Sequence, residues 1–142
     1  MIFPCKDYPD EKGQPDWYAA LKVRISCPVR HSPPSQSFEA MIDTGASRCI
    51  FHSEIGRSLG RIQIERGEVE NTMGVSGQTT RLYLHPVSIY IMGGAVPVTA
   101  GFSDELPLAG LLGRRGFLSR FKFSFDPSTD PPQFELTLIS RT

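Results

Sequence analysis

The residue types best suited to chemistry lie in one short segment, Asp43-Thr44-Gly45-Ala46, which directly follows two large apolar residues at 41–42. A carboxylate at the end of a buried strand is costly to ionise unless hydrogen-bond donors hold it. Gly45 permits a sharp turn that brings backbone N–H groups to the carboxylate, and Thr44 adds a short hydroxyl. The segment therefore predicts a held, desolvated carboxylate on Asp43. The plainer interpretation is an ordinary turn, since Asp, Thr and Gly are all common there.

Two further segments follow in the same chain. The run Met73-Gly74-Val75-Ser76-Gly77 lies between two expected strands, and its two glycines suit a mobile hairpin tip. The run Leu111-Leu112-Gly113-Arg114 follows an expected buried strand and opens an expected short helix. Each run alone could be a common turn or a helix start with a surface arginine. The three segments in this order are harder to explain as coincidence.

The elements that must position these segments are short strands. Alternation of apolar and polar residues, or short apolar runs between turn residues, indicates strands. The expected strands are Trp17–Cys27, Phe38–Ile42, Val69–Met73, Gln78–Leu84, Val87–Met92, Val96–Phe102, Ala109–Leu112, Lys122–Asp126 and Phe134–Ile139. Helix is expected only over Ser53–Leu59, as one or two turns, and over Gly113–Phe121. The pattern predicts an all-β domain, a small barrel or sandwich, spanning 17–142, with an irregular N-terminal extension at 1–16.

Charge and hydropathy exclude several classes of function. Lys+Arg and Asp+Glu both number 15 in a chain of 142 residues, so the basic footprint of a nucleic-acid-binding protein is missing. No apolar stretch approaches the length of a membrane helix. The charged, proline-containing start at 1–13 lacks the apolar centre of a secretory signal. We therefore expect a cytoplasmic protein with no nucleic-acid or membrane partner.

The three cysteines, Cys5, Cys27 and Cys49, are odd in number and widely spaced, which argues against a disulfide framework. Buried, idle thiols are the simplest interpretation. A zinc site from Cys27, His31, Cys49 and His52 is an alternative, but Cys49 and His52 lie three apart in an expected strand and point to opposite faces. A cysteine nucleophile at Cys49 lacks an evident third orienting residue. We therefore expect no metal and no cofactor.

The three segments together resemble the signature of the retropepsin-like aspartic peptidases, the class that contains retroviral proteases and their cellular and bacterial relatives. That signature is an apolar strand ending in Asp-Thr/Ser-Gly-Ala, a glycine-rich flap, and an apolar pair followed by Gly-Arg. The resemblance covers about residues 17–139. It implies a closed β barrel with a flap hairpin and one short helix in the C-terminal half.

The resemblance also implies roles for individual residues. Asp43 would be the catalytic carboxylate, with Thr44, Gly45 and Ala46 completing the active-site loop. Residues 73–77 would form the flap that binds substrate. Structural support near the site would come from Leu112, Gly113 and Arg114.

Members of this family need two Asp-Thr-Gly motifs, and this chain has one. The resemblance therefore implies a homodimer in which Asp43 from each copy forms a dyad that activates water. The expected activity is that of an aspartic endopeptidase acting on peptide or protein substrates. Ala46 removes a hydroxyl found in pepsin-like enzymes, so we expect an activity optimum at about pH 5–6 rather than pH 2.

The chain departs from the family pattern after the motif. Viral members often place an acid there, which pairs with the late arginine, whereas this chain has Ser47 and Arg48, so that partner of Arg114 is missing. Two other functions stay open. One is a non-catalytic module that binds peptides and dimerises, and the other is a structural β domain whose motif is accidental.

Overall fold

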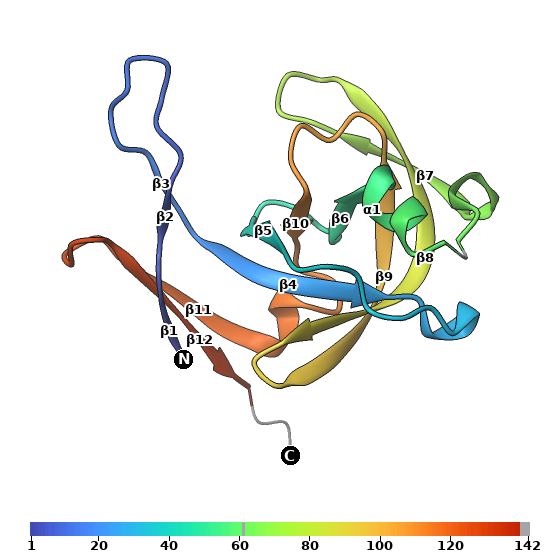
Figure 1. The fold of residues 1–142 in the computed structure, drawn as a ribbon. Coiled ribbons are helices and arrows are strands. Elements are labelled where there is room, and N and C mark those ends of the chain that lie inside the picture. The colour runs from blue at the N-terminus through green and yellow to red at the C-terminus, as the bar shows by residue number, and fades with distance from the viewer. Residues whose placement is uncertain (61, 140–142) are drawn as a thin grey trace.

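The computed structural model describes residues 1–60 and 62–139, and its centre is a closed barrel of strands (Figure 1). Six strands form the ring, in the order β4 (Ala20–Ser26), β5 (Phe38–Ile42), β10 (Gly110–Leu112), β6 (Ile50–His52), β9 (Gly94–Ser103) and β8 (Thr79–Ile91). Pairing of β4 with β8 closes it. Among the described strands, β7 (Glu68–Met73) pairs only with β8, and the two form a hairpin that extends from the ring. The predicted all-β barrel with a flap hairpin is confirmed.

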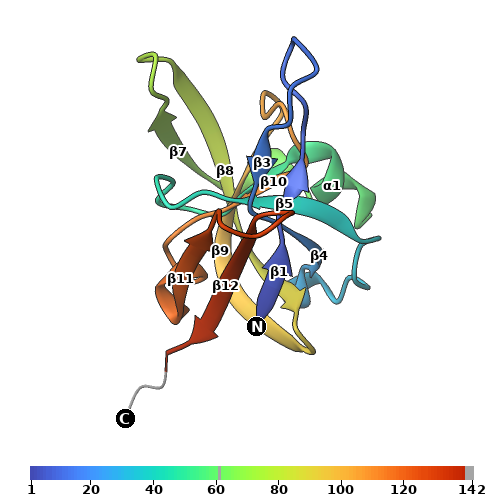
Figure 2. The ribbon, with the colours of Figure 1, turned by 90° about the vertical axis from the view of Figure 1, so that its left-hand side faces the viewer.

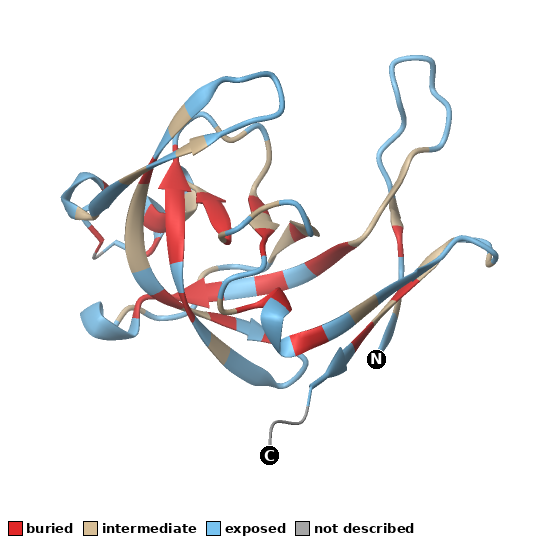
Figure 3. Ribbon diagram, turned by 180° about the vertical axis from the view of Figure 1, so that it is seen from behind, coloured by how far each residue is buried: buried red, intermediate tan, exposed pale blue. Residues whose placement is uncertain are grey.

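Alternation along the strands sorts side chains between the barrel interior and solvent. In β4, Leu21, Val23 and Ile25 are buried while Lys22 and Arg24 are exposed, as expected for a strand with one buried face. Figure 3 shows that buried residues gather on the barrel strands, whereas the projecting hairpins are largely exposed. The alternation therefore fixes which way β4 faces.

The long strand β8 merges two strands that the sequence predicted separately, at Gln78–Leu84 and Val87–Met92. On one edge β8 pairs with β7 up to Leu84, and with β4 from Ser88 onward. Pro86 lies between these two partners, where neither of them pairs, so its missing N–H removes no bond on that edge. The proline thus ends neither the strand nor its ladder with β9.

The N-terminal segment is not irregular throughout, which corrects the expectation for 1–16. Strand β1 (Ile2–Pro4) pairs with β12 (Gln133–Leu138), which in turn pairs with β11 (Phe121–Asp126). Phe3 stacks on Phe134 with ring centroids 5.2 Å apart. The partner strand lies at the other end of the chain, so local periodicity could not show the pairing.

The expected helix over Gly113–Phe121 is smaller than predicted, being a series of turns followed by one turn of 3-10 helix at Leu118–Arg120. Gly116 adopts a left-handed φ of +79° there, which interrupts an α-helix. The α-helix α1 (Ser53–Ser58) lies within the range expected for it. Among the described residues no helix is long and apolar enough to cross a bilayer.

A second hairpin, made by β2 (Lys6–Asp7) and β3 (Trp17–Tyr18), projects from the barrel in the same direction as the flap (Figures 1 and 2). We call residues 6–18 the N-terminal arm. The phenol of Tyr8 donates a hydrogen bond to Glu39 of β5, and the Tyr8 ring packs edge-on against Tyr18 with centroids 5.6 Å apart. Because β5 ends at Ile42, this contact ties the arm to the strand that precedes Asp43.

The arm gives a first testable prediction. The hydrogen bond to Glu39, with burial and the charge of Glu39 as smaller causes, raises the pKa of Tyr8 to about 12. Since the folded pKa is raised, this contact stabilises the arm fully below the unfolded value of about 10, and the stabilisation is lost as pH rises through the folded value. Titration of tyrosinate absorbance, subtracting the Tyr8→Phe curve from wild type, should give a midpoint near pH 12 for Tyr8. In Glu39→Gln the midpoint should fall toward about 10, and a midpoint near 10 in wild type would contradict the contact.

Candidate active site

The active-site loop begins where β5 ends, and two backbone contacts fix its first residue. The N–H of Asp43 donates to the carbonyl of Leu112 at 3.0 Å, which continues the parallel pairing of β5 with β10. The Asp43 Oδ1 atom accepts a hydrogen bond from the N–H of Gly45 at 2.9 Å, and the Asp43 carbonyl accepts from the N–H of Ala46 at 3.2 Å. The carboxylate is half-buried. A short turn therefore holds the carboxylate, which is only partly buried and not desolvated in the single chain.

Gly45 and Gly113 are the two glycines on which this geometry depends. A Cβ on Gly45 would lie 3.2 Å from Asp43 Oδ1. A Cβ on Gly113 would lie 2.2 Å from the carbonyl oxygen of Arg48 and 2.9 Å from that of Ala46. Since side chains cannot approach backbone this closely, Gly113 allows β10 and the following turn to pack directly on the loop.

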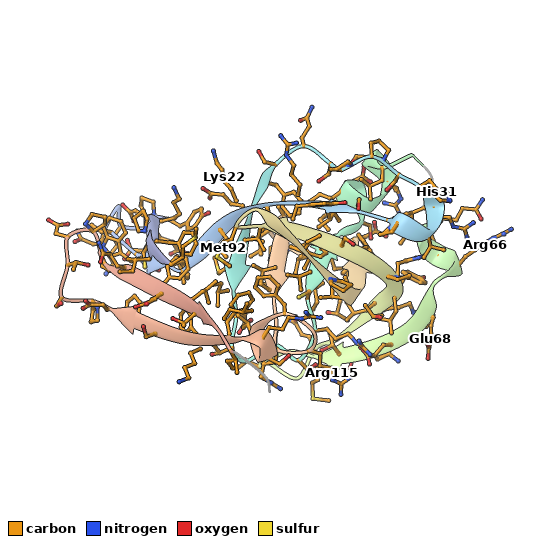
Figure 4. The ribbon with its side chains drawn as sticks, turned by 90° about the horizontal axis from the view of Figure 1, so that it is seen from below. Lys22, His31, Arg66, Glu68, Met92 and Arg115 are labelled. Atoms are coloured by element: carbon orange, nitrogen blue, oxygen red, sulfur yellow. The ribbon has the colours of Figure 1, made fainter. Side chains whose placement is uncertain are left out.

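Residues after β10 brace the loop further. The N–H of Arg114 donates to the carbonyl of Ala46 at 3.0 Å, and the N–H of Arg115 donates to that of Ser47 at 2.8 Å. The Arg114 Nη1 atom donates to the carbonyl of Thr44 at 2.8 Å. This backbone acceptor stands in place of the acid that the resemblance led us to expect. Arg115 is exposed and lies at the edge of the molecule (Figure 4).

The flap is the hairpin of β7 and β8, whose last ladder pair joins Met73 to Thr79. Its tip is closed by a hydrogen bond from the N–H of Gly74 to the carbonyl of Gln78 at 2.8 Å, and Gly77 takes the left-handed φ of +79° that the turn requires. Met73 and Val75 are both highly exposed, at 74% and 111%. Two apolar side chains at an exposed tip suit contact with a ligand or with a second chain.

A cleft of about 630 Å³ lies between the loop and the flap. It is lined by predicted site residues from three separate segments: Asp43, Gly45, Ala46, Met73, Gly74, Val75 and Arg114. Other predicted residues lie outside its lining: Thr44, Ser76, Gly77, Leu112 and Gly113. Leu112 and Gly113 are buried supports, whereas Thr44 is exposed at the end of the loop.

Sequence reasoning missed most of the wall of this cleft. The missed residues are Ser47, Arg48, Ile50, Glu70, Thr72, Gln78, Thr80, Leu82, Ser103, Glu105, Leu106 and Pro107, and Leu111 lies in the third segment but was given no role at the site. They come from several strands and from the connection after β9, so only the barrel closure brings them together. Apart from Ser47 and Arg48, which directly follow the active-site motif, no single stretch of sequence carries a signal for them.

The cysteine alternatives find little support in the geometry. Cys49 is fully buried, and burial raises the pKa of its thiol to about 11, so it is protonated at neutral pH and is a poor nucleophile. His52 uses its Nδ1 atom to accept from the N–H of Glu54 at 3.1 Å, at the start of α1. In the described part of the chain, Cys27, His31, Cys49 and His52 do not come together in a group that could hold a metal ion.

Comparisons with known proteins give structural neighbours only. No family model matches the sequence, and no curated protein matches it. A retropepsin-like aspartic protease from Rickettsia conorii aligns with a TM-score of 0.58 at 18% identity, covering 96% of this chain and 88% of that one. The EIAV protease aligns with a TM-score of 0.49 at 22% identity, covering 68% of this chain and 82% of that one. The retroviral protease-like domain of Ddi1 from Leishmania major aligns with a TM-score of 0.41 at 15% identity, covering 66% of this chain and 70% of that one.

The alignment with the Rickettsia structure runs over nearly the whole chain and rests on the shared arrangement of strands. At this level of identity it establishes the fold and leaves the chemistry to the site itself. The neighbours of this chain among solved structures are retropepsin-like aspartic proteases, and the chain has the retropepsin-like all-β fold.

Proposed function

We propose that this chain is one subunit of a homodimeric aspartic endopeptidase with Asp43 as its catalytic residue. The observation that carries the proposal is the placement of Asp43. Its carboxylate is held by the Gly45 N–H and opens into a cleft whose other side is the flap. Hydrolysis of an extended peptide needs an accessible acid, backbone groups beneath the peptide and a flap that closes over it.

The second carboxylate of the dyad is proposed to come from another copy of the chain. Besides Asp43, two acids line the cleft, Glu70 and Glu105. Glu70 is engaged by Arg48, and Glu105 comes from the connection after β9 and not from the loop that carries Asp43. A two-fold axis beside Asp43 would set two identical, equally held carboxylates face to face. The exposure of Thr44 and of its loop leaves room for this contact.

The chemistry follows from the crowding of the two acids. Two carboxylates about 3 Å apart share one proton, because both cannot ionise easily. The ionised member takes a proton from a bound water, which attacks the scissile carbonyl, while the protonated member polarises the carbonyl oxygen. When the tetrahedral intermediate collapses, a proton passes to the leaving amine and the peptide bond breaks. No covalent acyl-enzyme forms.

The remaining residues have positioning roles in this proposal. Thr44 would link the two loops across the axis, and Gly45 and Ala46 would offer backbone to the substrate. Residues 73–77 would close over the peptide and exclude water. The three free, buried thiols are consistent with a reducing compartment, so we place the activity in the cytoplasm.

Incubation of the purified protein with a diverse peptide mixture, from about pH 4 to pH 7, tests the proposal. Cleavages identified by mass spectrometry are expected, and they would reveal the side chains preferred on each side of the cut. Absence of cleavage at concentrations where the protein is shown to be dimeric would favour the alternative, a peptide-binding module without activity.

A further inference from the structure

One ion pair joins the active-site loop to the flap. Arg48 Nε lies 2.5 Å from Glu70 Oε2, and Arg48 Nη2 lies 3.3 Å from Glu70 Oε1. Arg48 lies between the active-site loop and the start of β6. Glu70 lies in the middle of β7, the first strand of the flap. Both side chains line the cleft. The pair therefore connects the active-site loop, on one side of the cleft, to the flap on the other.

The geometry of this pair is that of a strong contact. Both carboxylate oxygens of Glu70 accept from one guanidinium, which is the bidentate arrangement. The Arg48 side chain is only 16% exposed and that of Glu70 35% exposed, so water screens them less than a pair on an open surface. Arg48 Nη1 also lies 3.5 Å from the carbonyl of Thr99. These contacts engage the guanidinium within the protein, which makes Arg48 a poor receptor for a substrate carboxylate.

Glu70 lies at the base of the exposed part of the flap, where an ion pair can affect the position of the tip. Glu70 is opposite Leu82, a buried residue of β8 that also lines the cleft. Met73 lies three residues further along β7, about 10 Å away at the usual strand rise. Residues 73–79 are all exposed. The ion pair at Glu70 therefore helps to set the distance between the exposed part of the flap and the active-site loop.

We propose that Arg48 and Glu70 form a tether that positions the flap over Asp43 and so sets how tightly an extended peptide is held. The inference rests on the proposed peptidase function for its effect on substrate, but the tether itself is a property of the free protein. Both residues are positioning residues. A charge-swapped pair should perform the same task.

Spin labels test the tether without any need for catalysis. Val75→Cys at the flap tip and Lys122→Cys on the exposed face of β11 supply the two label sites, and the three native thiols are buried. Labelled chains are diluted with unlabelled protein so that each pair of labels is measured within one chain. Wild type should give one main distance, while Arg48→Gln and Glu70→Gln should raise the population with the flap displaced by about five- to thirty-fold. The double variant Arg48→Glu with Glu70→Arg should restore the wild-type distribution.

The matched control is Arg57→Gln, which removes an equally well-paired arginine. Arg57 pairs with Glu54, Glu65 and Asp104 at 2.8 to 2.9 Å, and none of these three acids belongs to the flap. It should leave the distance distribution unchanged. Higher salt should widen the wild-type distribution toward that of Arg48→Gln. Single variants with a wild-type distribution, or a charge swap that folds with unchanged stability yet fails to restore it, would overturn the tether.

A binding measurement then links the tether to substrate. In the Asp43→Asn background, a fluorescent peptide taken from the cleavage products should bind about five-fold more weakly when Glu70→Gln is added, and the charge swap should recover the affinity. With active enzyme the same change should appear in KM, with kcat changed less than about two-fold. A loss of the same size in kcat, with KM unchanged, would contradict a role in holding the peptide. Failure of the peptidase proposal would remove this second readout and leave the spin-label result standing.

Discussion

Replacement of Asp43 by asparagine should reduce peptide cleavage by on the order of 10⁴-fold or more, because the amide keeps the shape of the side chain but cannot take a proton from water. The introduced amide can still accept from the Gly45 N–H through its carbonyl oxygen, a contact that the Asp43 carboxylate makes at 2.9 Å in wild type. The loop should therefore keep its conformation. Initial rates on a peptide found in the cleavage screen give the measurement.

The control for this substitution is Asp126→Asn, an exposed acid at the end of β11, next to the turn that leads to β12. Its hydrogen bonds with Ser128 lower the pKa of Asp126, so its loss affects that turn and not the cleft. Cleavage should remain within about two-fold of wild type. Urea midpoints confirm that both variants are folded. If Asp43→Asn cleaved at the wild-type rate, another group would have to be the catalyst.

Gly113→Ala should cost about 3 kcal/mol in the free energy of unfolding and should also impair cleavage. The added methyl would lie 2.2 Å from the carbonyl oxygen of Arg48 and 2.5 Å from its carbonyl carbon. These are backbone atoms, which cannot rotate away as the end of a side chain can. Either β10 or the active-site loop must shift, and the turn that holds Asp43 shifts with it.

Gly94→Ala is the matched control, since its Cβ would meet only the Ile91 carbonyl oxygen at 3.9 Å. Gly94 is exposed at the start of β9 and does not line the cleft. Urea unfolding followed by circular dichroism should show a change within about 0.5 kcal/mol for Gly94→Ala. If Gly113→Ala unfolded at the same urea concentration as Gly94→Ala, the close packing of β10 on the loop would be wrong.

The parts of this fold that the sequence predicted are those whose signal is local. The strand β4 could be predicted because Leu21, Val23 and Ile25 alternate with charged residues, and burial follows that alternation. The flap could be predicted because two strand patterns flank a glycine-bounded turn. The all-β class then followed from the series of short strands, whereas the closed barrel was implied by the resemblance of the three segments, and the structure confirms both.

The parts that could not be predicted depend on partners distant in sequence. β1 is a strand because β12 offers it an edge, and β8 runs through Pro86 because of where its two neighbours end and begin. Arg114 takes the Thr44 carbonyl as its acceptor, which no motif indicates. Likewise, the acid that Arg48 contacts comes from β7. A basic residue after the motif, where viral members have an acid, could therefore be explained only from the position of the flap in the structure.

Mixing of active and inactive subunits tests the shared dyad most directly. Wild type and Asp43→Asn are combined in equal amounts at fixed total concentration and left until subunits exchange, which native mass spectrometry of an isotope-labelled partner can follow. If each site needs Asp43 from both copies, only the wild-type homodimers cleave, and activity should fall to about one quarter of the unmixed value. An activity of about one half, in proportion to the wild-type fraction, would show that each chain acts with its own carboxylate and would contradict the dimeric site.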